Sequence, residues 1–355
     1  MRGACGYVEG SIEEIYNKMK IAIHDSKKEH FFSERWIEYC SSNNIPFKTV
    51  NAYDNDIINQ VKDCNIFMWH HSNYDYRDAL FAKQLLYSLE TIGVKVFPDF
   101  NTTWHFDDKV GQKYLLEAID APLVPSYVFY NKKDARKWIE STSFPKVFKL
   151  RGGSGSSNVQ LVENKHKAKK LIKKAFGKGF SQFDKFNHLK FRYKNFKSGK
   201  ESFVGVLKGI VRLFIGNKYS NMVPKEKGYV YFQEFIPNNK FDTRIVVVGG
   251  ERAAGEKRYV RKNDFRASGS GDYNYEGIDL KAVGIAFNVS KRLKLQSVAF
   301  DFVLDRNKQP LIVEMSYGFG VEGISNAPGY WDSSLTWYQE EFKPQEWMIE
   351  NIIDK

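Results

Sequence analysis

Cysteines and long apolar runs are scarce in this sequence, and each absence excludes a class of protein. The three cysteines, Cys5, Cys40 and Cys64, lie far apart and lack the short spacings of zinc sites and disulfide frameworks. No stretch approaches the roughly 18 uncharged apolar residues of a membrane span. The N-terminal segment carries glutamates and no apolar core, unlike a secretion signal. We therefore expect a cytoplasmic protein without a transmembrane segment.

Acidic residues are also scarce in one segment, residues 165–227, which holds 18 Lys and Arg against three Asp and Glu. The whole chain has a formal net charge of +12, so the remainder is slightly acidic. A localised positive field attracts an anionic partner such as a nucleotide, an acidic glycan, a nucleic acid or an anionic lipid surface. A lysine-rich face that only aids solubility is the alternative.

The chain of 355 residues is too long for a single standard module. Over residues 1–105, short apolar runs alternate with helix-length polar stretches, which predicts a small open α/β domain around a mostly parallel sheet. Ligands of such sheets bind beyond the carboxyl ends of the strands, so His70, His71 and Ser72 are candidate site residues. A polar strand end without a role is the alternative. From Phe144 onward, longer strands and hairpins predict an α+β region of antiparallel sheets.

An apolar strand, FPKVFKL, ends at Lys149 and leads into a glycine- and serine-rich loop. The loop contains Gly153, Ser154, Gly155 and Ser156. Glycines let backbone N–H groups converge on phosphate oxygens, and a lysine adds a point charge. The motif predicts a phosphate cradle, distinct from a P-loop or Rossmann fingerprint, with a flexible hairpin as the alternative. Alternation puts Lys146 on the opposite face of the strand, where we expect it to matter little.

The segment SVAFDFVLDRNKQPLIVEMSYG reads as a hairpin that turns about Asn307 and Lys308. A symmetric register would place Asp301 directly opposite Glu314. Carboxylates that face each other repel unless a cation binds between them, and oxygen-rich ligation suits magnesium with bound phosphates. The pattern predicts a magnesium site, and a chance surface pair is the alternative.

Three arginines stand near these motifs: Arg244 in FDTRIVV, Arg258 in GEKRYV and Arg266 in NDFRASGSG. Arginine holds carboxylate or phosphate in a fixed planar geometry. Together with the glycine loop and the facing carboxylates, the arginines indicate a site for a nucleoside triphosphate, a metal ion and an anionic acceptor.

From about His105 to Ile324, these motifs resemble the ATP-grasp superfamily in their order. The similarity is greatest to its branch of ribosomal-protein-modifying and glutathione-synthetase-like amino-acid ligases. The resemblance implies that residues 1–105 are a pre-ATP-grasp domain and that a two-lobed ATP-grasp fold follows. The first lobe, 106–232, would hold the glycine loop and a basic lid-like insertion, and the C-terminal lobe, 233–355, the metal site.

The resemblance also implies roles for individual residues. FDDK looks like the segment whose lysine contacts the nucleotide phosphates, here Lys109, and Lys149 would be the second phosphate lysine. YFQEFIP resembles the hinge that holds adenine, and the FDTR that follows would place Asp242 near the ribose. The hinge residues are Gln233, Glu234, Phe235 and Ile236. DFRASGSG resembles the arginine segment that meets the reacting phosphoryl group.

Two positions depart from the family pattern. The family usually has asparagine two residues after the metal-binding glutamate, and this chain has Ser316 as the third candidate metal ligand. A hydroxyl is a weaker ligand than an amide carbonyl, which affects the second magnesium ion. Ala267 and Ser268 stand where the family has an asparagine soon after Arg266, so the acceptor pocket is expected to differ.

The resemblance implies an ATP-dependent ligase that activates a carboxylate as an acyl phosphate and joins it to an amine. ATP and one or two Mg²⁺ ions would be the cofactors, with Mn²⁺ as a substitute, and Arg266, Arg258 and Arg244 the catalytic residues. The expected acceptor is a nucleotide- or lipid-linked uronic acid of surface-polysaccharide synthesis, reached by peripheral contact where it is lipid-linked. A peptide or protein carboxylate is the alternative acceptor. A nucleotide-gated nucleic-acid-binding protein is the alternative of another class, disfavoured because facing carboxylates repel a nucleic-acid backbone.

Overall fold

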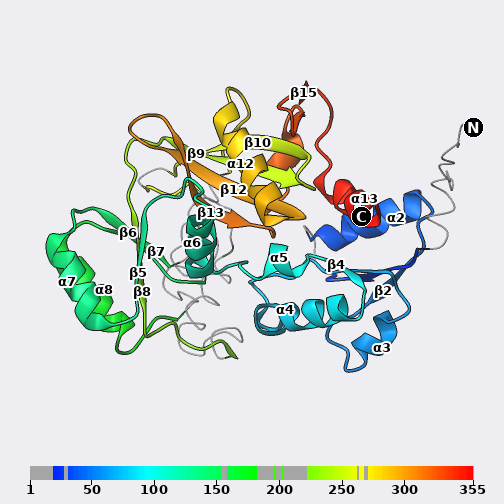
Figure 1. Cartoon of the computed structure of the whole chain (residues 1–355), viewed down its shortest axis with the longest axis horizontal. Helices are drawn as coiled ribbons and strands as arrows, with labels where there is room; N and C mark the ends of the chain where they lie inside the picture. The colour runs from blue at the N-terminus through cyan, green and yellow to red at the C-terminus, as the bar shows by residue number, and fades with distance from the viewer. Residues whose placement is uncertain are drawn as a thin grey trace, which may run out of the picture.

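The computed structural model describes residues 19–27, 31–152, 158–181, 196, 202, 222–261, 264–267 and 271–354. Three sheets follow one another along the long axis of the molecule (Figure 1). The N-terminal α/β region lies at one end, a small antiparallel sheet at the other, and the largest sheet between them. Among the described residues, no helix is both long and apolar enough to cross a membrane.

The N-terminal region is an open α/β unit, as the sequence predicts. Its four-stranded sheet is parallel throughout, in the order β2-β1-β3-β4. Ile21 and Ile23 of the central strand pack with α2, whereas Ala22 packs with α3 and α4 on the other face. The elements are β1 (Ile21–His24), α2 (Phe32–Ser42), β2 (Phe47–Val50), α3 (Ile57–Val61), β3 (Ile66–Met68), α4 (Tyr76–Thr91) and β4 (Lys95–Phe97).

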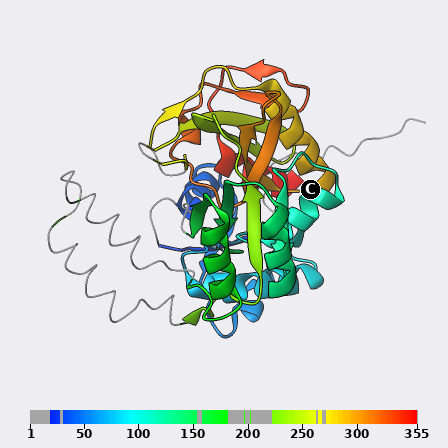
Figure 2. The ribbon, with the colours of Figure 1, turned by 90° about the vertical axis from the view of Figure 1, so that its left-hand side faces the viewer.

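Two short helices, α5 (Phe100–Thr103) and α6 (Lys109–Ala118), lead into the first antiparallel sheet, which has the order β5-β8-β6-β7. Helices α7 and α8 cover its outer face, which Figure 2 turns toward the viewer. Val147 and Lys149 lie on the inner face and line a cavity. The elements are β5 (Ser126–Phe129), α7 (Lys132–Ser141), β6 (Lys146–Lys149), β7 (Val159–Val162), α8 (Lys165–Ala175) and β8 (Val230–Glu234).

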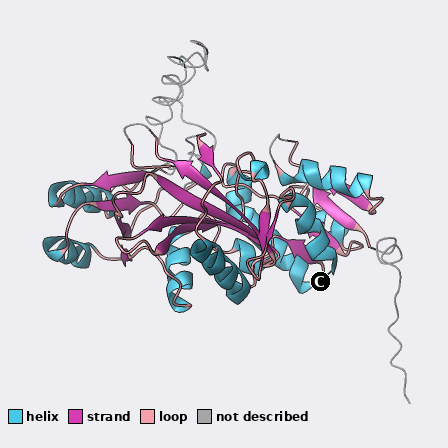
Figure 3. Ribbon diagram, turned by 90° about the horizontal axis from the view of Figure 1, so that it is seen from above, coloured by secondary structure: helices cyan, strands magenta, loops and turns pink. Residues whose placement is uncertain are grey.

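The largest sheet has the order β13-β12-β9-β10-β14-β15, with β11 beside β10, and its long strands are seen from above in Figure 3. Ile245 and Val247 of β9 pack with α12 on one face of the sheet. Val246 and Val248 lie on the other face and pack in a separate cluster. The elements are β9 (Phe241–Val248), β10 (Arg252–Tyr259), β11 (Tyr273–Asn274), α12 (Leu280–Leu293), β12 (Ser297–Leu304), β13 (Pro310–Ser316), η1 (Ile324–Asn326), β14 (Tyr330–Asp332), β15 (Trp337–Tyr338) and α13 (Pro344–Asp354).

One hydrophobic cluster joins the N-terminal sheet to this largest sheet. Trp36 of α2, Val246 of β9 and Met348 of α13 belong to it. The Tyr317 hydroxyl, just after β13, donates to the backbone carbonyl of His71 at 2.5 Å. The largest sheet is therefore fixed against the N-terminal unit by a shared core.

Candidate active site: a cleft between two sheets

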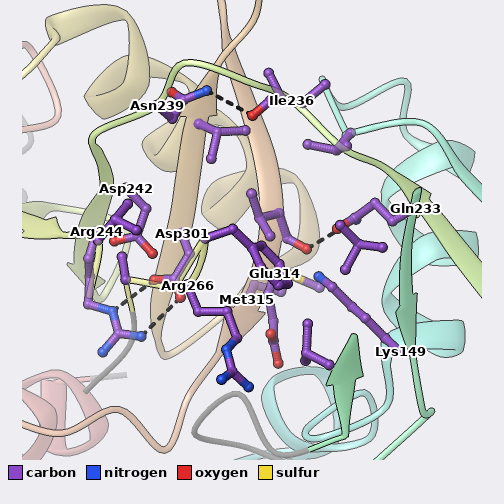
Figure 4. A pocket seen from close by; sticks show the side chains of 18 of the residues that line it. Lys149, Gln233, Ile236, Asn239, Asp242, Arg244, Arg266, Asp301, Glu314 and Met315 are labelled. Carbon is purple, nitrogen blue, oxygen red and sulfur yellow. Dashed lines mark hydrogen bonds and ion pairs between the residues drawn. The ribbon is translucent and has the colours of Figure 1, made fainter. Parts of the chain in front are cut away.

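A cavity of about 520 Å³ lies between the inner face of the β5-β8-β6-β7 sheet and the β9, β12 and β13 strands (Figure 4). It brings together most of the residues singled out from the sequence. Lining it are Lys109, Lys149, Gln233, Glu234, Phe235, Ile236, Asp242, Arg244, Arg266, Asp301, Glu314 and Ser316. Arg258 lies behind the wall, bonded to Asp301. Gly153, Ser154, Gly155 and Ser156 lie outside the described residues.

The end of the cavity at the β8–β9 connection is largely aliphatic, which the sequence did not indicate. Its polar side chains are engaged by the protein: the Gln233 amide donates to the Ser126 hydroxyl at 3.1 Å and, more weakly, to the Val313 carbonyl at 3.4 Å. Asn239 binds the backbone N–H and carbonyl of Leu304 at 2.8 and 3.0 Å. The aliphatic lining includes Val124, Val147, Val159, Ile236, Val303 and Val313. A flat, mainly apolar ring suits this slot.

Lys146 forms a buried ion pair that the sequence did not predict. It is 1% exposed, and its ammonium donates to both carboxylate oxygens of Glu234 at 2.6 and 2.8 Å. Tyr127 donates to the same carboxylate at 3.1 Å. Strand alternation is as predicted, but α7 and α8 cover the outer face of the sheet, so all four residues of β6 are buried. A buried charge needs its partner, so the pair gives Lys146 a structural role. That its substitution changes ATP affinity and turnover little stays a prediction.

Two buried lysines meet near Glu314, and their environments differ. The Lys109 ammonium lies 3.0 Å from Glu314 Oε1 and 3.8 Å from Asp107 Oδ1. Burial disfavours its charge, but the two carboxylates outweigh burial and raise the pKa of Lys109. Burial lowers the pKa of Lys149, Glu314 opposes the change and Lys109 adds to it, which leaves the pKa at about 8. Of these two lysines, only Lys149 has a pKa close to the physiological pH range.

The β12–β13 hairpin confirms that Asp301 pairs with Glu314, and Ser316 pairs with Ala299. The symmetric register fails between Asp301 and the turn of the hairpin. A bulge shifts the pairing so that Phe302 faces Ile312. An extra residue, Val313, is accommodated on β13, which bends the strand next to the candidate metal ligands.

Asp301 is not a bare carboxylate repelled by Glu314. Arg244, opposite it on β9, donates to both of its oxygens at 2.8 and 3.1 Å, and Arg258 lies 2.8 Å from Oδ2. Burial opposes ionisation, but the two guanidinium groups hold the pKa of Asp301 well below its usual range. Each of the facing carboxylates thus has its own cation, Lys109 in the case of Glu314.

Arg258 continues this network to Asp242, its partner across β9 and β10, with two bonds of 2.7 Å. Glu256 on β10 faces Arg244 and is 2% exposed. Its Oε2 accepts no hydrogen bond from the described residues. Burial, only partly offset by Arg244 and Arg258, raises the pKa of Glu256 to about 6. Sequence reasoning missed Glu256, because only the order of the strands places it beside Arg244 and in line with Asp301.

Arg266 reaches the cavity from the segment after β10 (Figure 4). Its guanidinium donates from Nε to both oxygens of Asp264 at 2.9 Å and from Nη2 at 2.6 Å. Asp264 therefore fixes the plane of the guanidinium at the mouth of the site.

Asp301, Glu314 and Ser316 offer oxygen donors on one face of two neighbouring strands. Within the described parts of the chain, no group of three or more His, Cys, Asp or Glu side chains is close enough to hold a metal by itself. Magnesium usually binds one or two carboxylates together with substrate phosphates. The donor set fits that mode of binding.

The candidates at the end of β3 do not line this cavity. His70 stacks on Phe32, with ring centroids 3.7 Å apart, and accepts the Phe32 N–H at 3.1 Å. His71 and Ser72 line a second cavity of about 670 Å³, beside Arg151. The His70 ring also lies edge-on to Tyr317, with centroids 6.2 Å apart, so it contributes to the contact between the N-terminal unit and the largest sheet.

Comparisons with known proteins agree with this architecture. Residues 216–330 match the RimK-like ATP-grasp domain. No curated protein sequence matches the chain. The structure resembles a RimK-domain ATP-grasp protein from Sphaerobacter thermophilus DSM 20745, with a TM-score of 0.51, 16% identity, and coverage of 83% of this chain and 90% of that one.

Two further solved structures cover almost the whole chain. D-cycloserine synthetase DcsG has a TM-score of 0.58 and 11% identity, with 95% of this chain and 99% of that one covered. D-alanine–D-alanine ligase from Bacillus anthracis, solved with ATP, has a TM-score of 0.55 and 13% identity, with 95% and 96% covered. At these low identities, the structural similarity shows the fold, which is that of ATP-grasp proteins. The RimK-like ATP-grasp match over residues 216–330 agrees with it.

Proposed function

We propose that the protein transfers the γ-phosphoryl group of ATP to a substrate carboxylate and then joins the acyl group to an amine. The carboxylate oxygen attacks phosphorus and releases ADP. The amine then attacks the acyl carbon, loses a proton and displaces phosphate, so that an amide forms. The observation that carries this proposal is the charged row Glu314–Asp301–Arg244 across β13, β12 and β9, at the end of an aliphatic cleft.

The slot at the β8–β9 connection is the proposed adenine site, with peptide groups from Gln233 to Ile236 along its edge. Asp242 would face the ribose from the start of β9. Lys109 and Lys149 would contact the phosphates. Both are buried beside Glu314, so that their charges act in a poorly solvated site.

Asp301, Glu314 and Ser316 would hold one or two Mg²⁺ ions. The ion would neutralise charge on the triphosphate when bound. Because Asp301 already contacts Arg244 and Arg258, a cation at Asp301 competes with them. We propose that Arg244 and Arg266, which line the cavity, then hold the anionic oxygens of the phosphoryl group and the acceptor. Arg258 would act from behind them, through Asp242 and Asp301. The chemistry requires no side-chain nucleophile.

The proposed acceptor carries its carboxylate on a larger anionic group. Support comes from the basic segment 165–227 and from Lys225 and Lys227, which are exposed at the rim of the second cavity. A nucleotide- or lipid-linked uronic acid has this chemistry and is our first candidate. A carboxylate on a peptide or protein is the second.

A phosphate-release screen tests the proposal. Purified protein, ATP and Mg²⁺ are combined with a matrix of carboxylic acids and amines that includes uronic acid nucleotides and acidic peptides. We expect phosphate release that requires both an acid and an amine and yields an amide detectable by mass spectrometry. Release stimulated by RNA or DNA instead, with no amide, would support the nucleic-acid alternative and overturn ours.

A further inference from the structure

Gln112 occupies an unusual position one turn after Lys109 on α6. It is 3% exposed, and its amide binds the backbone of Met315 twice, donating to the carbonyl at 2.8 Å and accepting from the N–H at 3.2 Å. It also donates to the His105 carbonyl at 3.1 Å. Among the described residues, β13 is the edge strand of its sheet, so that no strand of this part of the chain adjoins Met315 on that side. The side-chain amide of Gln112 supplies the donor and acceptor that a neighbouring strand would supply.

The rest of the β13 edge is held differently. Ile312 donates to the Pro122 carbonyl at 2.7 Å and accepts from the Val124 N–H at 2.9 Å. Between these bonds and Met315 lies the bulge, where the Gln233 amide is 3.4 Å from the Val313 carbonyl. A bulged edge strand is the least constrained part of a sheet. The contact from Gln112 therefore fixes the strand between two candidate metal ligands.

We infer that Gln112 is a positioning residue for the metal and phosphate end of the cleft, a role that rests on the proposed function. Lys109 and Gln112 stand three residues apart on one helix and so project from the same side. Lys109 bonds Glu314, and Gln112 bonds the next residue, Met315. One rigid turn of helix thus sets the position of a phosphate lysine relative to Glu314 and Ser316.

The test compares Gln112→Met, which keeps the side-chain length but removes all three hydrogen bonds, with wild-type protein. Calorimetry measures ATP affinity with excess Mg²⁺ and again with a chelator. Residues that orient metal ligands typically contribute about tenfold or more to metal affinity. We expect an affinity about tenfold lower with Mg²⁺ and changed less than about twofold without it.

Gln309→Met is the matched control, because Gln309 is an exposed glutamine in the turn of the same hairpin. Its side-chain amide donates to the Asn307 carbonyl at 3.1 Å and accepts weakly from Lys281 at 3.4 Å. We expect wild-type affinity in both conditions. If Gln112→Met does not fold, Gln112→Glu provides the test, since it keeps an acceptor for the Met315 N–H but places a carboxylate against its carbonyl. It should also lose Mg²⁺-dependent affinity.

An equal loss with and without Mg²⁺, or a lower melting temperature with unchanged affinities, would make Gln112 a structural residue and overturn the inference. Failure of the proposed function is a separate outcome. In that case the wild-type protein itself shows no Mg²⁺-dependent ATP binding.

Discussion

The two ends of the cleft differ in what their polar groups contact. At the β8–β9 connection, Gln233 and Asn239 bind other parts of the protein and leave an aliphatic slot. At the β12–β13 end, the polar groups are ions paired with one another, as Asp301 is with Arg244 and Arg258. Under the proposed function, the first end needs no rearrangement of these bonds to take adenine. The second would exchange ion pairs as phosphates and a cation enter, so substitutions at the two ends should have different consequences.

The largest expected effect is at Asp301. Asp301→Asn removes a charge that compensates two arginines, and breaking a buried pair in this way costs about 3 kcal/mol. We expect no detectable turnover, together with a lower melting temperature in metal-free buffer. Enzyme assays and thermal denaturation measure the two effects. A rise in melting temperature would instead mean that repulsion between Asp301 and Glu314 dominates.

Glu314→Gln is the companion variant that sharpens this contrast. Glu314 pairs with Lys109 alone among the described cations, and Lys109 keeps Asp107 at 3.8 Å. We expect turnover to be lost while stability falls by only about 1 kcal/mol, since Glu314 itself is partly exposed and buried Lys109 retains Asp107 as a partner. Similar destabilisation of both variants would contradict the assignment of separate cations to the two carboxylates.

Lys146→Met tests the preformed end. The substitution leaves the Glu234 carboxylate with Tyr127 but without its cation, which should lower the free energy of unfolding by about 2 kcal/mol. Since Lys146 does not line the cavity, ATP affinity should fall only through displacement of the strand. Urea denaturation and ATP titration check these outcomes. Lys133→Met, at an exposed position on α7, is the control, and equal destabilisation there would refute the role of the pair.

Lys149 gives the charged end a pH dependence. Its pKa of about 8 means that the ammonium is present below pH 8 and lost as the pH rises through that value. Phosphates favour the protonated form, so ATP affinity should fall by up to about tenfold per pH unit above 8, until the pKa in the complex is reached. Lys149→Arg stays charged and should flatten the profile. If the ATP affinity of the wild-type protein did not change between pH 7 and 9, this assignment to Lys149 would be contradicted.

Sequence reasoning predicted those parts of the site that depend on local patterns. The pairing of Asp301 with Glu314 follows from a hairpin of two adjacent strands joined by a short turn, and Lys149 from alternation along one strand. Contacts between distant segments were not predictable in this way. The Gln112 bonds to Met315 span 203 residues. The arginine contacts of Asp301 depend on β9 lying between β12 and β10, an order that no local pattern reports.

The smallest expected effect is at the rim of the second cavity. Lys225 and Lys227 are exposed there and are the last two lysines of the basic segment. Neutralising both to Gln should raise the Michaelis constant for an anionic acceptor about threefold at low salt and leave ATP affinity unchanged, because exposed charges contribute little individually. The effect should vanish in about 1 M salt, where the Debye length is about 3 Å. Neutralising Lys132 and Lys133, exposed on α7, removes the same charge from a surface outside both cavities and controls for net charge. An equal change in the control would assign the effect to the global field of the protein, and no change in either variant would leave the basic segment without a role in acceptor binding at this rim.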